Sequence, residues 1–508
     1  MRKNQILTIF FAILIALYFV FNVFKLSIIL DNDFGWHLKT GEYIKNYGIP
    51  QNDPFSYTMP SFPFVNHAWL TSLLVFELYS LESKFLLPTL FTLLAFLSVL
   101  LIVYPFWSKQ NRVPKYLILI LAILCLAAFA PYIGIRSQVA SWLMFSILFV
   151  VLLNKKLFES YKILIPLLIL VWVNIHGSFI AGIFILTIVI IVKTIKNKKV
   201  DKTNFLVLIG SFFATFINPY KERIWNEVWM QLSDGKLDER IVEWLPSFYF
   251  FNPSFLILLV LSALLMLKYQ KKVSWEEKIL YLILSSQAIL TTRHVPIFSL
   301  FSLYLILKSL NFFAEEIKKI KYGLSRFKKA SIYFSIIIFV ILVLENFFWI
   351  DWLSKYSVSK FYPQEAVIYL KNNMPHGNIF SEYGWGGYLI WQYPEKKVFI
   401  DGRMPTWKWN NAPSKELSNA MDTYLKILRG EIDSKNIFTQ FNIDTVLWSK
   451  SQNQKTKDSN LKKILKHIED KFNKYYKFSL NYNFLEELQN EGWKVVYEDK
   501  TSVILKIQ

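Results

Sequence analysis

Acidic, basic and amide side chains interrupt the apolar stretches of this chain at a few places, and their types suit chemistry on a phosphate. They are Asp31/Asp33, His67, Arg136, Asn174/His176, Asn218 and Arg293/His294. Arg and His can bind a phosphate and stabilise its charge as it departs, because Arg presents several N–H donors in a fixed fork. An Asp can accept the proton of an attacking hydroxyl. The combination predicts group transfer from a phosphate-linked donor to a hydroxyl.

Each of these residues taken alone also has a structural explanation. An Arg at a helix end, such as Arg136 or Arg293, can extend to the lipid headgroups. A lone His176 is more often an interhelical hydrogen-bonding group, and Asn174 and Asn218 fit a structural role. An ionisable group at membrane depth costs about 2.5 to 3.5 kcal/mol, so a set of them on one side of a membrane favours function.

The lengths of the apolar runs indicate a membrane protein. A content of 54% hydrophobic and 18% aromatic residues suits either a large soluble assembly or a membrane protein. Residues 6–24, 86–106, 116–130 and 330–348 approach or reach the roughly 20 apolar residues that cross a bilayer. The first run follows Met1-Arg2-Lys3 and is longer than the apolar core of a secretory signal, so we interpret it as an uncleaved anchor.

Lys and Arg gather in alternate connections between these runs, which is the pattern of cytoplasmic loops. The basic stretches are 109–115, 155–156, 193–202, 268–272 and 318–329. Placing all of them inside predicts about 11 spans in the cytoplasmic membrane, with the N-terminus inside, if residues 66–81 form a helix in the outer interface. The predicted spans are 6–24, 86–106, 116–133, 138–153, 159–175, 177–192, 203–218, 253–267, 277–291, 296–310 and 331–350. The net charge of +20 is thereby assigned to inner loops and not to nucleic-acid binding.

Beyond Asp351 the apolar runs shorten to strand length, which predicts a second domain. We expect a transmembrane domain over residues 1–352 and a soluble extracytoplasmic α/β domain over 353–508. In the latter, 364–372 should be a helix, 397–400 and 444–448 strands, 493–507 a hairpin, and 455–463 a polar loop or helix start. The predicted fold class is a polytopic α-helical membrane protein with a C-terminal extracytoplasmic α/β domain.

The first outer connection, residues 31–67, carries the carboxylates that could do chemistry. Asp31-Asn32-Asp33 is formally a DxD motif, and with His37 it could ligate a divalent cation such as Mg or Mn, which prefer oxygen ligands. The spacing is common and loop carboxylates are usually solvated, so metal binding stays open. Cys125 is the only cysteine, which excludes an intrachain disulfide and a cysteine–zinc site.

Several local sequences resemble a known superfamily. They are Asp31-Asn32-Asp33 with Trp36-His37, Asn52-Asp53-Pro54-Phe55-Ser56, Asn66-His67-Ala68-Trp69-Leu70, Arg136-Ser137-Gln138, Trp172 to Ser178, Asn218-Pro219 and Arg293-His294-Val295-Pro296. Together with the topology they resemble the GT-C superfamily of polyprenyl-phosphate-sugar-dependent glycosyltransferases, and look like a widespread bacterial branch of it. Protein mannosyltransferases and lipid A aminoarabinose transferases belong to that superfamily. The chain departs from the mannosyltransferase pattern at His67-Ala68-Trp69, where it lacks a proline pair, so sugar and acceptor are not carried over.

The resemblance implies that the first outer loop carries the catalytic acid, Asp31 or Asp33. We prefer Asp33, because one helical turn from it would bring His37 onto the same face. Arg136, Arg293 and His294 would hold the donor phosphate. His37, His67, Asn174 and His176 would orient the substrates.

A second motif lies in the C-terminal domain, at residues 382–390 and 399–403. It is similar to the aromatic-acidic-glycine motif of the oligosaccharyltransferase catalytic subunit. Glycines permit close backbone approach, and Trp and Tyr offer stacking faces for sugars, although a packed turn explains the same residues. If the motif is functional, Glu382, Tyr383 and Trp385 face the acceptor, and Asp401 and Arg403 line a cleft.

The favoured function is an inverting, GT-C-type hexosyl or pentosyl transfer from a polyprenyl-phosphate sugar to a hydroxyl of a glycan, lipid or protein outside the cytoplasmic membrane. The expected partners are the bilayer, the donor and the acceptor, and the one cofactor considered is the divalent cation. One alternative is a ligase that uses a polyprenyl-diphosphate glycan donor. Another, from a different class, is a transporter or flippase of an anionic lipid-linked substrate; scarce Asp and Glu within the spans and no visible repeat rank it lower.

Overall fold

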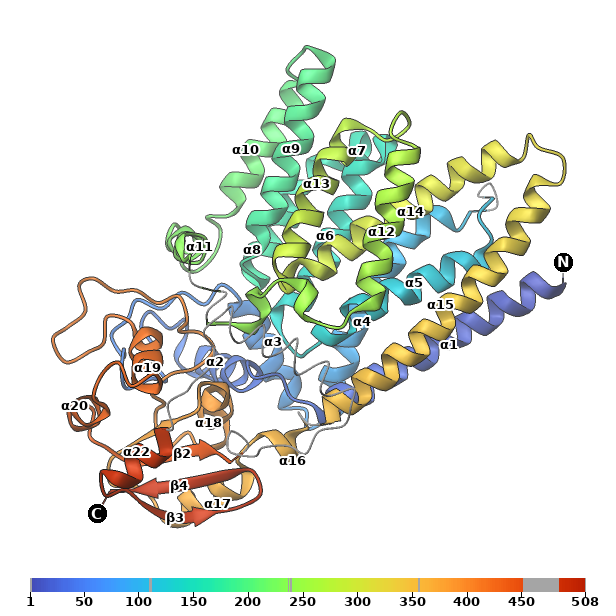
Figure 1. Ribbon diagram of the computed structural model, residues 1–508. Helices are drawn as coiled ribbons and strands as arrows, with labels where there is room; N and C mark the ends of the chain where they lie inside the picture. The colour runs from blue at the N-terminus through green and yellow to red at the C-terminus, as the bar shows by residue number, and fades with distance from the viewer. Residues whose placement is uncertain are drawn as a thin grey trace. The chain divides into compact units, whose positions relative to one another are not determined.

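The computed structural model describes residues 2–108, 112–235, 237, 240–354, 357–450 and 484–507, leaving aside the side chains of 2, 3 and 351–354. The predicted polar loop at 455–463 lies outside the described residues. The chain divides into two compact units (Figure 1). Unit 1 comprises Met1–Ile29, Leu78–Ile224 and Glu243–Ser354, and unit 2 comprises Leu30–Glu77, Trp225–Val242 and Lys355–Gln508.

Unit 1 is a bundle of helices, and each predicted span falls on one of them or on a helical series. Its helices are α1 (Arg2–Ile28), α4 (Leu86–Val103), α5 (Lys115–Phe129), α6 (Ser137–Leu153), α7 (Lys155–Tyr161), α8 (Ile165–Ile175), α9 (Phe179–Asn197), α10 (Lys202–Ala214), α12 (Pro253–Lys268), α13 (Trp275–Leu290), α14 (Val295–Ile317) and α15 (Gly323–Ser354). Short 3-10 turns adjoin several of them: η1 (Tyr104–Phe106), η2 (Ala130–Tyr132), η3 (Lys162–Leu164) and η6 (Thr292–His294). Two further 3-10 turns, η4 (Val242–Trp244) and η5 (Ser247–Tyr249), lie in the loop before α12.

Seven helical stretches in the described part of the chain are long and apolar enough to cross a membrane. They are Asn4–Ile28, Leu86–Phe106, Lys115–Tyr132, Lys155–Ile175, Phe179–Asn197, Thr292–Ile317 and Gly323–Ile350. The other predicted spans fall on the shorter helices α6, α10, α12 and α13. Helices and sheet together confirm a polytopic helical membrane protein with a smaller α/β part.

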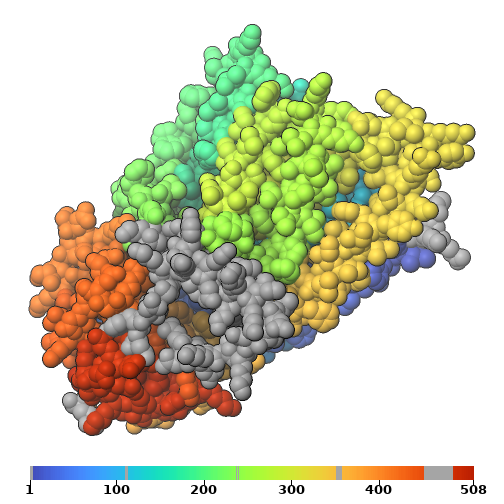
Figure 2. All heavy atoms as spheres, in the orientation of Figure 1, coloured from blue at the N-terminus to red at the C-terminus, as the bar shows by residue number. Residues whose placement is uncertain are grey.

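Helix α5 lies at the centre of unit 1. Every residue from Tyr116 to Phe129 is buried, and the helix packs against α1, α4, α12, α14 and α15. A helix that is apolar on all sides is expected to be buried in this way. Helices α1 and α15 instead expose large apolar side chains such as Ile9 and Ile337, as lipid-facing helices do. In the space-filling view the yellow-green and yellow helices α12 to α15 pack against one another (Figure 2).

Unit 2 combines short helices with one small sheet. Its elements are α2 (Phe34–Tyr47), most of α3 (Trp69–Tyr79) and of α11 (Arg223–Ser233), α16 (Val358–Phe361), α17 (Gln364–Asn372), β1 (Asn378–Ser381), η7 (Tyr383–Trp385), α18 (Gly386–Gln392), α19 (Ala420–Leu428), α20 (Ser434–Gln440), β2 (Ile443–Ser449), α22 (Phe484–Asn490), β3 (Lys494–Glu498) and β4 (Ser502–Lys506). The strand order is β1-β2-β4-β3, and only β1 and β2 pair in parallel.

The predictions for this unit are mostly confirmed. Helix 364–372 is α17, strand 444–448 lies in β2, and the 493–507 hairpin is β3 and β4. The predicted strand at 397–400 is wrong. Val398 makes one isolated bridge with Ser56, whereas Phe399 and Ile400 are fully buried, so this apolar run fills the core instead of joining the sheet.

The segment 53–64 of the first loop packs within unit 2. The amide of Val398 donates to the carbonyl of Phe55 at 3.0 Å, and the amide of Tyr57 donates to the carbonyl of Val398 at 3.1 Å. Met59, Phe62 and Phe64 join the same apolar core as Phe380 and Trp448 of the sheet. The sequence predicts this loop to be part of the transmembrane domain, but the loop clusters with the C-terminal residues.

Candidate active site

In unit 2, Asp31 and Asp33 lie directly before helix α2 and are half-buried. One oxygen of Asp33, Oδ1, accepts the indole N–H of Trp36 at 2.8 Å. The Oδ1 atom of Asp31 accepts the backbone N–H of Asp33 at 3.0 Å. These bonds fix the orientation of both carboxylates at the start of the helix.

Glycines bring the two sequence motifs of unit 2 into backbone contact. A Cβ atom on Gly35 would lie 1.9 Å from the carbonyl oxygen of Gly387, and one on Gly387 would lie 2.2 Å from that of Asn32. A Cβ on Gly402 would lie 2.2 Å from Oδ1 of Asp33. The start of α2, the start of α18 and the turn at 401–403 therefore approach so closely that no side chain fits between them.

We predict that Gly402→Ala displaces the Asp33 carboxylate and destabilises the protein. The added methyl group overlaps Oδ1 of Asp33, and such overpacking typically costs about 1–3 kcal/mol. The thermal unfolding midpoint should fall, together with any activity that depends on Asp33. Gly235→Ala is the matched control, because nothing lies within 4 Å of a Cβ there. Equal midpoints for the two variants would contradict the close approach.

Asp401 and Arg403 do not line a cleft, which corrects the expectation from the sequence. The Arg403 guanidinium donates to Asp401 at 2.6 and 2.8 Å and to Asp53 at 2.7 Å, and the side chains of all three are buried. Phe55, Phe64 and Trp407 surround the guanidinium at 5.0 to 5.5 Å. Burial alone would lower the pKa of Arg403, but the two carboxylates raise it above its ordinary value. This cluster joins the first loop to the turn at 401–403 and is structural.

The first residues of the C-terminal motif are also largely engaged in packing. Trp385 is buried and its indole N–H donates to the carbonyl of Phe361 at 2.9 Å, so its ring offers no face to a sugar. The amide of Tyr383 donates to the hydroxyl of Tyr424 at 3.0 Å. Glu382 accepts the amide of Ser449 at 3.0 Å, and burial raises its pKa to about 7. A role for Glu382 and Tyr383 on the acceptor side stays a prediction.

His37 faces helix α3. Its Nδ1 lies 2.9 Å from the hydroxyl of Ser72, to which the amide of Asn66 also donates at 3.2 Å. The imidazole is stacked on Trp36, with 3.7 Å between the ring centres. Since Trp36 donates to Asp33, this chain of contacts joins the candidate base to the loop that carries His67.

The side chains around Asp31 and Asp33 do not form the metal-binding set that the DxD motif suggested. Among the described residues, no group of three or more His, Cys, Asp and Glu side chains could hold a metal ion. Asp33 Oδ1 is bonded to Trp36, and Nδ1 of His37 faces Ser72. We therefore assign no step to a metal.

His67 pairs with Glu227, a residue that the sequence motifs do not mark. Its Nδ1 lies 3.9 Å from Oε1 of Glu227, which also accepts the side-chain amide of Gln231 at 3.0 Å. Glu227 shares the buried face of α11 with Ile224 and Val228, so an acidic residue on that face was the available signal. Burial raises the pKa of Glu227 to about 7, although the Gln231 hydrogen bond opposes the shift.

We predict that Glu227→Gln changes the pH dependence of stability. A carboxyl whose pKa is raised from 4.5 to about 7 in the folded state binds its proton more tightly there, so stability is full below pH 4.5 and falls as the pH rises through 7. The variant should lack this pH dependence. The thermal midpoint of the variant minus that of the wild type should therefore be more positive at pH 8 than at pH 5. The difference is roughly 3 kcal/mol at most.

Glu382→Gln is the matched control, because burial raises the pKa of Glu382 to about 7 as well. Glu382→Gln should also reduce the loss of stability between pH 5 and pH 8. In the double variant the two reductions should add. A Glu227→Gln effect of the same size at pH 5 and pH 8 would contradict the assignment.

In unit 1, Arg136 and Arg293 meet around one carboxylate. Arg136 forms a salt bridge with Glu243, and its Nη2 donates to the carbonyl of Tyr132 at 3.3 Å. Burial alone would raise the pKa of Glu243, but the charges of Arg136 and Arg293 lower it below its ordinary value. Lys25 donates to the carbonyl of Ala130 at 2.7 Å, so a third basic side chain reaches the same turn, η2, as Arg136 does.

Two turns of the chain hold these groups in place. The Thr292 amide donates to the carbonyl of Leu245 and its hydroxyl to that of Glu243, both at 2.9 Å. The Arg293 guanidinium lies 5.5 Å from the Trp244 ring. We call Lys25, Arg136, Glu243, Arg293 and His294 the Arg136 cluster. His294 contacts the hydroxyl of Thr291, and its ring centre lies 6.4 Å from that of Trp244. The structure thus brings together the three residues predicted to bind phosphate, and adds Lys25 and Glu243, which the sequence analysis missed.

His176 and Asn174 occupy a separate, buried network. The His176 Nδ1 lies 3.0 Å from the Ser141 hydroxyl and 2.8 Å from that of Ser178, and it accepts the Ser178 amide at 3.2 Å. The proton of a neutral His176 is therefore on Nε2. Asn174 donates to the carbonyls of Leu170 and Ile217. These contacts favour the structural explanation, and a role in orienting substrate stays a prediction.

Asn218 closes a turn rather than facing a ligand. Its side chain accepts the amide of Tyr220 at 2.8 Å and donates to the carbonyl of Thr215 at 2.7 Å. Within unit 1, hydrogen bonds join the end of α1 to η2, the start of α6 to η6, and the end of α8 to the residues after α10. These bonds link the helix ends and turns that carry the predicted polar residues of this unit.

A comparison with solved structures finds the archaeal oligosaccharyltransferase AglB from Archaeoglobus fulgidus, in complex with an inhibitory peptide and a dolichol-phosphate. The TM-score is 0.55, with 11% sequence identity over 88% of this chain and 69% of that chain. No family model matches the chain, and no curated protein matches it. A likeness at this identity shows the fold alone, a bundle of apolar helices with a smaller α/β part.

Proposed function

We propose that this protein is a membrane glycosyltransferase that transfers a sugar from a polyprenyl-phosphate donor to a hydroxyl group on the extracytoplasmic side of the cytoplasmic membrane. The observation that carries the proposal is the meeting of Arg136 and Arg293 around Glu243. Each guanidinium presents several N–H donors in a fixed fork, so the cluster is suited to a phosphate. The GT-C fold and the dolichol-phosphate bound to AglB support the same donor class.

In the proposed reaction, Asp33 accepts the proton of the acceptor hydroxyl, whose oxygen attacks the anomeric carbon of the donor. The new carbon–oxygen bond forms as the bond to the phosphate oxygen breaks, which inverts the anomeric centre. Arg136, Arg293 and His294 bind the departing polyprenyl phosphate and stabilise its charge. Asp31 is the alternative base, and the Trp36 hydrogen bond orients Asp33 for its role.

A second candidate is the transfer of a whole glycan from a polyprenyl-diphosphate carrier. It is supported by the likeness to AglB, an oligosaccharyltransferase. Offering the monophosphate and diphosphate donors to the same preparation separates the two functions. The true donor is the one from which carrier lipid is released.

We predict that Asp33→Asn lowers the rate of carrier release from a labelled donor by about 10²–10⁴-fold, because the amide cannot accept the acceptor's proton. Asp31→Asn should have a smaller effect. Asp422→Asn is the control, since Asp422 lies on α19 and pairs with Lys426 at 3.0 Å. Turnover that survives both Asp31→Asn and Asp33→Asn would remove the proposed base.

A further inference from the structure

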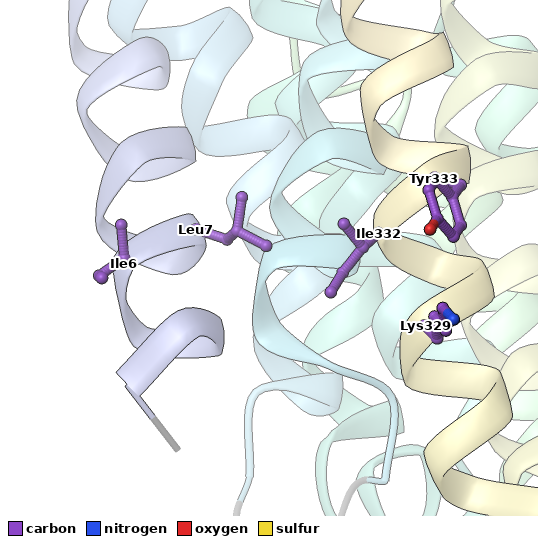
Figure 3. Close-up of a pocket in the computed structure, with 5 residues that line it drawn as sticks. All are labelled: Ile6, Leu7, Lys329, Ile332 and Tyr333. Carbon is purple, nitrogen blue, oxygen red and sulfur yellow. The ribbon is translucent and has the colours of Figure 1, made fainter.

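A crevice of about 420 Å³ lies between helices α1 and α15 of unit 1. Its lining residues are Ile6 and Leu7 from α1, and Lys329, Ile332 and Tyr333 from α15. The side chains of Leu7 and Ile332 extend into the space between the two helices (Figure 3). A volume of this size falls within the range of ligand pockets.

Helix α5 holds the two walls of the crevice apart. It packs against both α1 and α15. The hydroxyl of Tyr116 on α5 donates to the carbonyl of Lys328 at 2.9 Å and lies 2.6 Å from the hydroxyl of Ser331. Tyr116 and Ser331 are both buried, so this contact fixes the first turns of α15 on α5. The crevice is thus a built feature of the bundle.

One side of the crevice carries polar groups. Lys329 and Tyr333 lie one helical turn apart on α15, so the ammonium and the phenol can reach one ligand. Both residues are exposed. Among the described residues, no carboxylate forms an ion pair with Lys329, and no hydrogen bond engages the Tyr333 hydroxyl. An ammonium and a hydroxyl together are donors suited to a phosphate.

The side chains around the start of α15 are mostly positively charged, which favours an anionic ligand. The nearby acids on α14 are already paired, Glu315 with Arg112 at 3.3 Å and Glu316 with Lys272 at 2.7 Å. The cations that follow have no ion pair within the part of the chain that the structure describes; they are Lys318, Lys319, Lys321, Arg326, Lys328 and Lys329. Basic pockets between membrane helices characteristically bind anionic headgroups.

We propose that this crevice is a binding site for an anionic glycerophospholipid. One acyl chain lies between α1 and α15 against Ile6, Leu7 and Ile332, and the lipid phosphate contacts Lys329 and Tyr333. The polyprenyl-phosphate donor is not the occupant, because Ile6 lies about 28 Å along α1 from Lys25 of the Arg136 cluster. The site is independent of the proposed glycosyl transfer.

The test is native mass spectrometry of the full-length protein, supplied with equal amounts of phosphatidylglycerol and phosphatidylcholine. The wild type should retain phosphatidylglycerol preferentially. Lys329→Gln should lower that retention about fivefold, as the loss of one Lys at a membrane surface implies. Ile332→Trp should fill the crevice and release the lipid without a change of charge.

Lys328→Gln is the matched control. It removes the same charge from the residue directly before Lys329, and that residue does not line the crevice. It should retain phosphatidylglycerol as the wild type does. Equal losses for Lys328→Gln and Lys329→Gln would show diffuse attraction and overturn the site. Equal retention of the two lipids by the wild type, or displacement of phosphatidylglycerol by added polyprenyl phosphate, would overturn it as well.

Discussion

A charged group cannot rest in hydrocarbon without a partner, and this constraint explains how unit 1 is arranged. Its central helix α5 is apolar on every side, and the groups that could react gather at one end of the bundle. There Glu243 compensates Arg136 and Arg293, and backbone carbonyls of the η2 turn accept hydrogen bonds from Lys25 and Arg136. The Arg136 cluster is therefore tolerated by its surroundings, and its guanidiniums offer the donors that the proposed phosphate site needs.

Unit 2 depends on a different constraint, the close approach of backbone to backbone. Gly35, Gly387 and Gly402 let the Asp33 turn, the start of α18 and the 401–403 turn meet without intervening side chains. Arg403 then joins Asp53 to Asp401 inside an aromatic cage. The glycine and aspartate residues of the C-terminal motif thus support the carboxylate that carries the proposed chemistry, and do not themselves form a sugar-binding surface.

Much of the fold was predictable, because run length and the distribution of Lys and Arg determine where apolar helices begin and end. The gathering of Arg136, Arg293 and His294 also followed from the alternation of helix ends. The long-range partners were not predictable: Glu243 has ordinary sequence surroundings. Glu227 stands out as an acidic residue on the apolar face of α11, but only packing shows that its partner is His67. The strand predicted at 397–400 was wrong for the same reason, since an apolar run does not reveal whether it joins a sheet or fills a core. The sequence suggested that Arg403 binds a ligand, because neither carboxylate partner is evident from it. Asp53 is 350 residues away in the sequence, and Asp401 pairs with Arg403 only because the chain turns between them.

The central claim is that the Arg136 cluster binds the phosphate of a polyprenyl carrier. The most direct measurement is the affinity of polyprenyl phosphate for the protein in nanodiscs, by titration calorimetry. Arg136→Gln and Arg293→Gln should each weaken binding by about tenfold or more, because each removes charge-assisted hydrogen bonds. Arg326→Gln, which removes an arginine near the start of α15, should leave it unchanged. Unaltered affinity in both cluster variants would contradict the account.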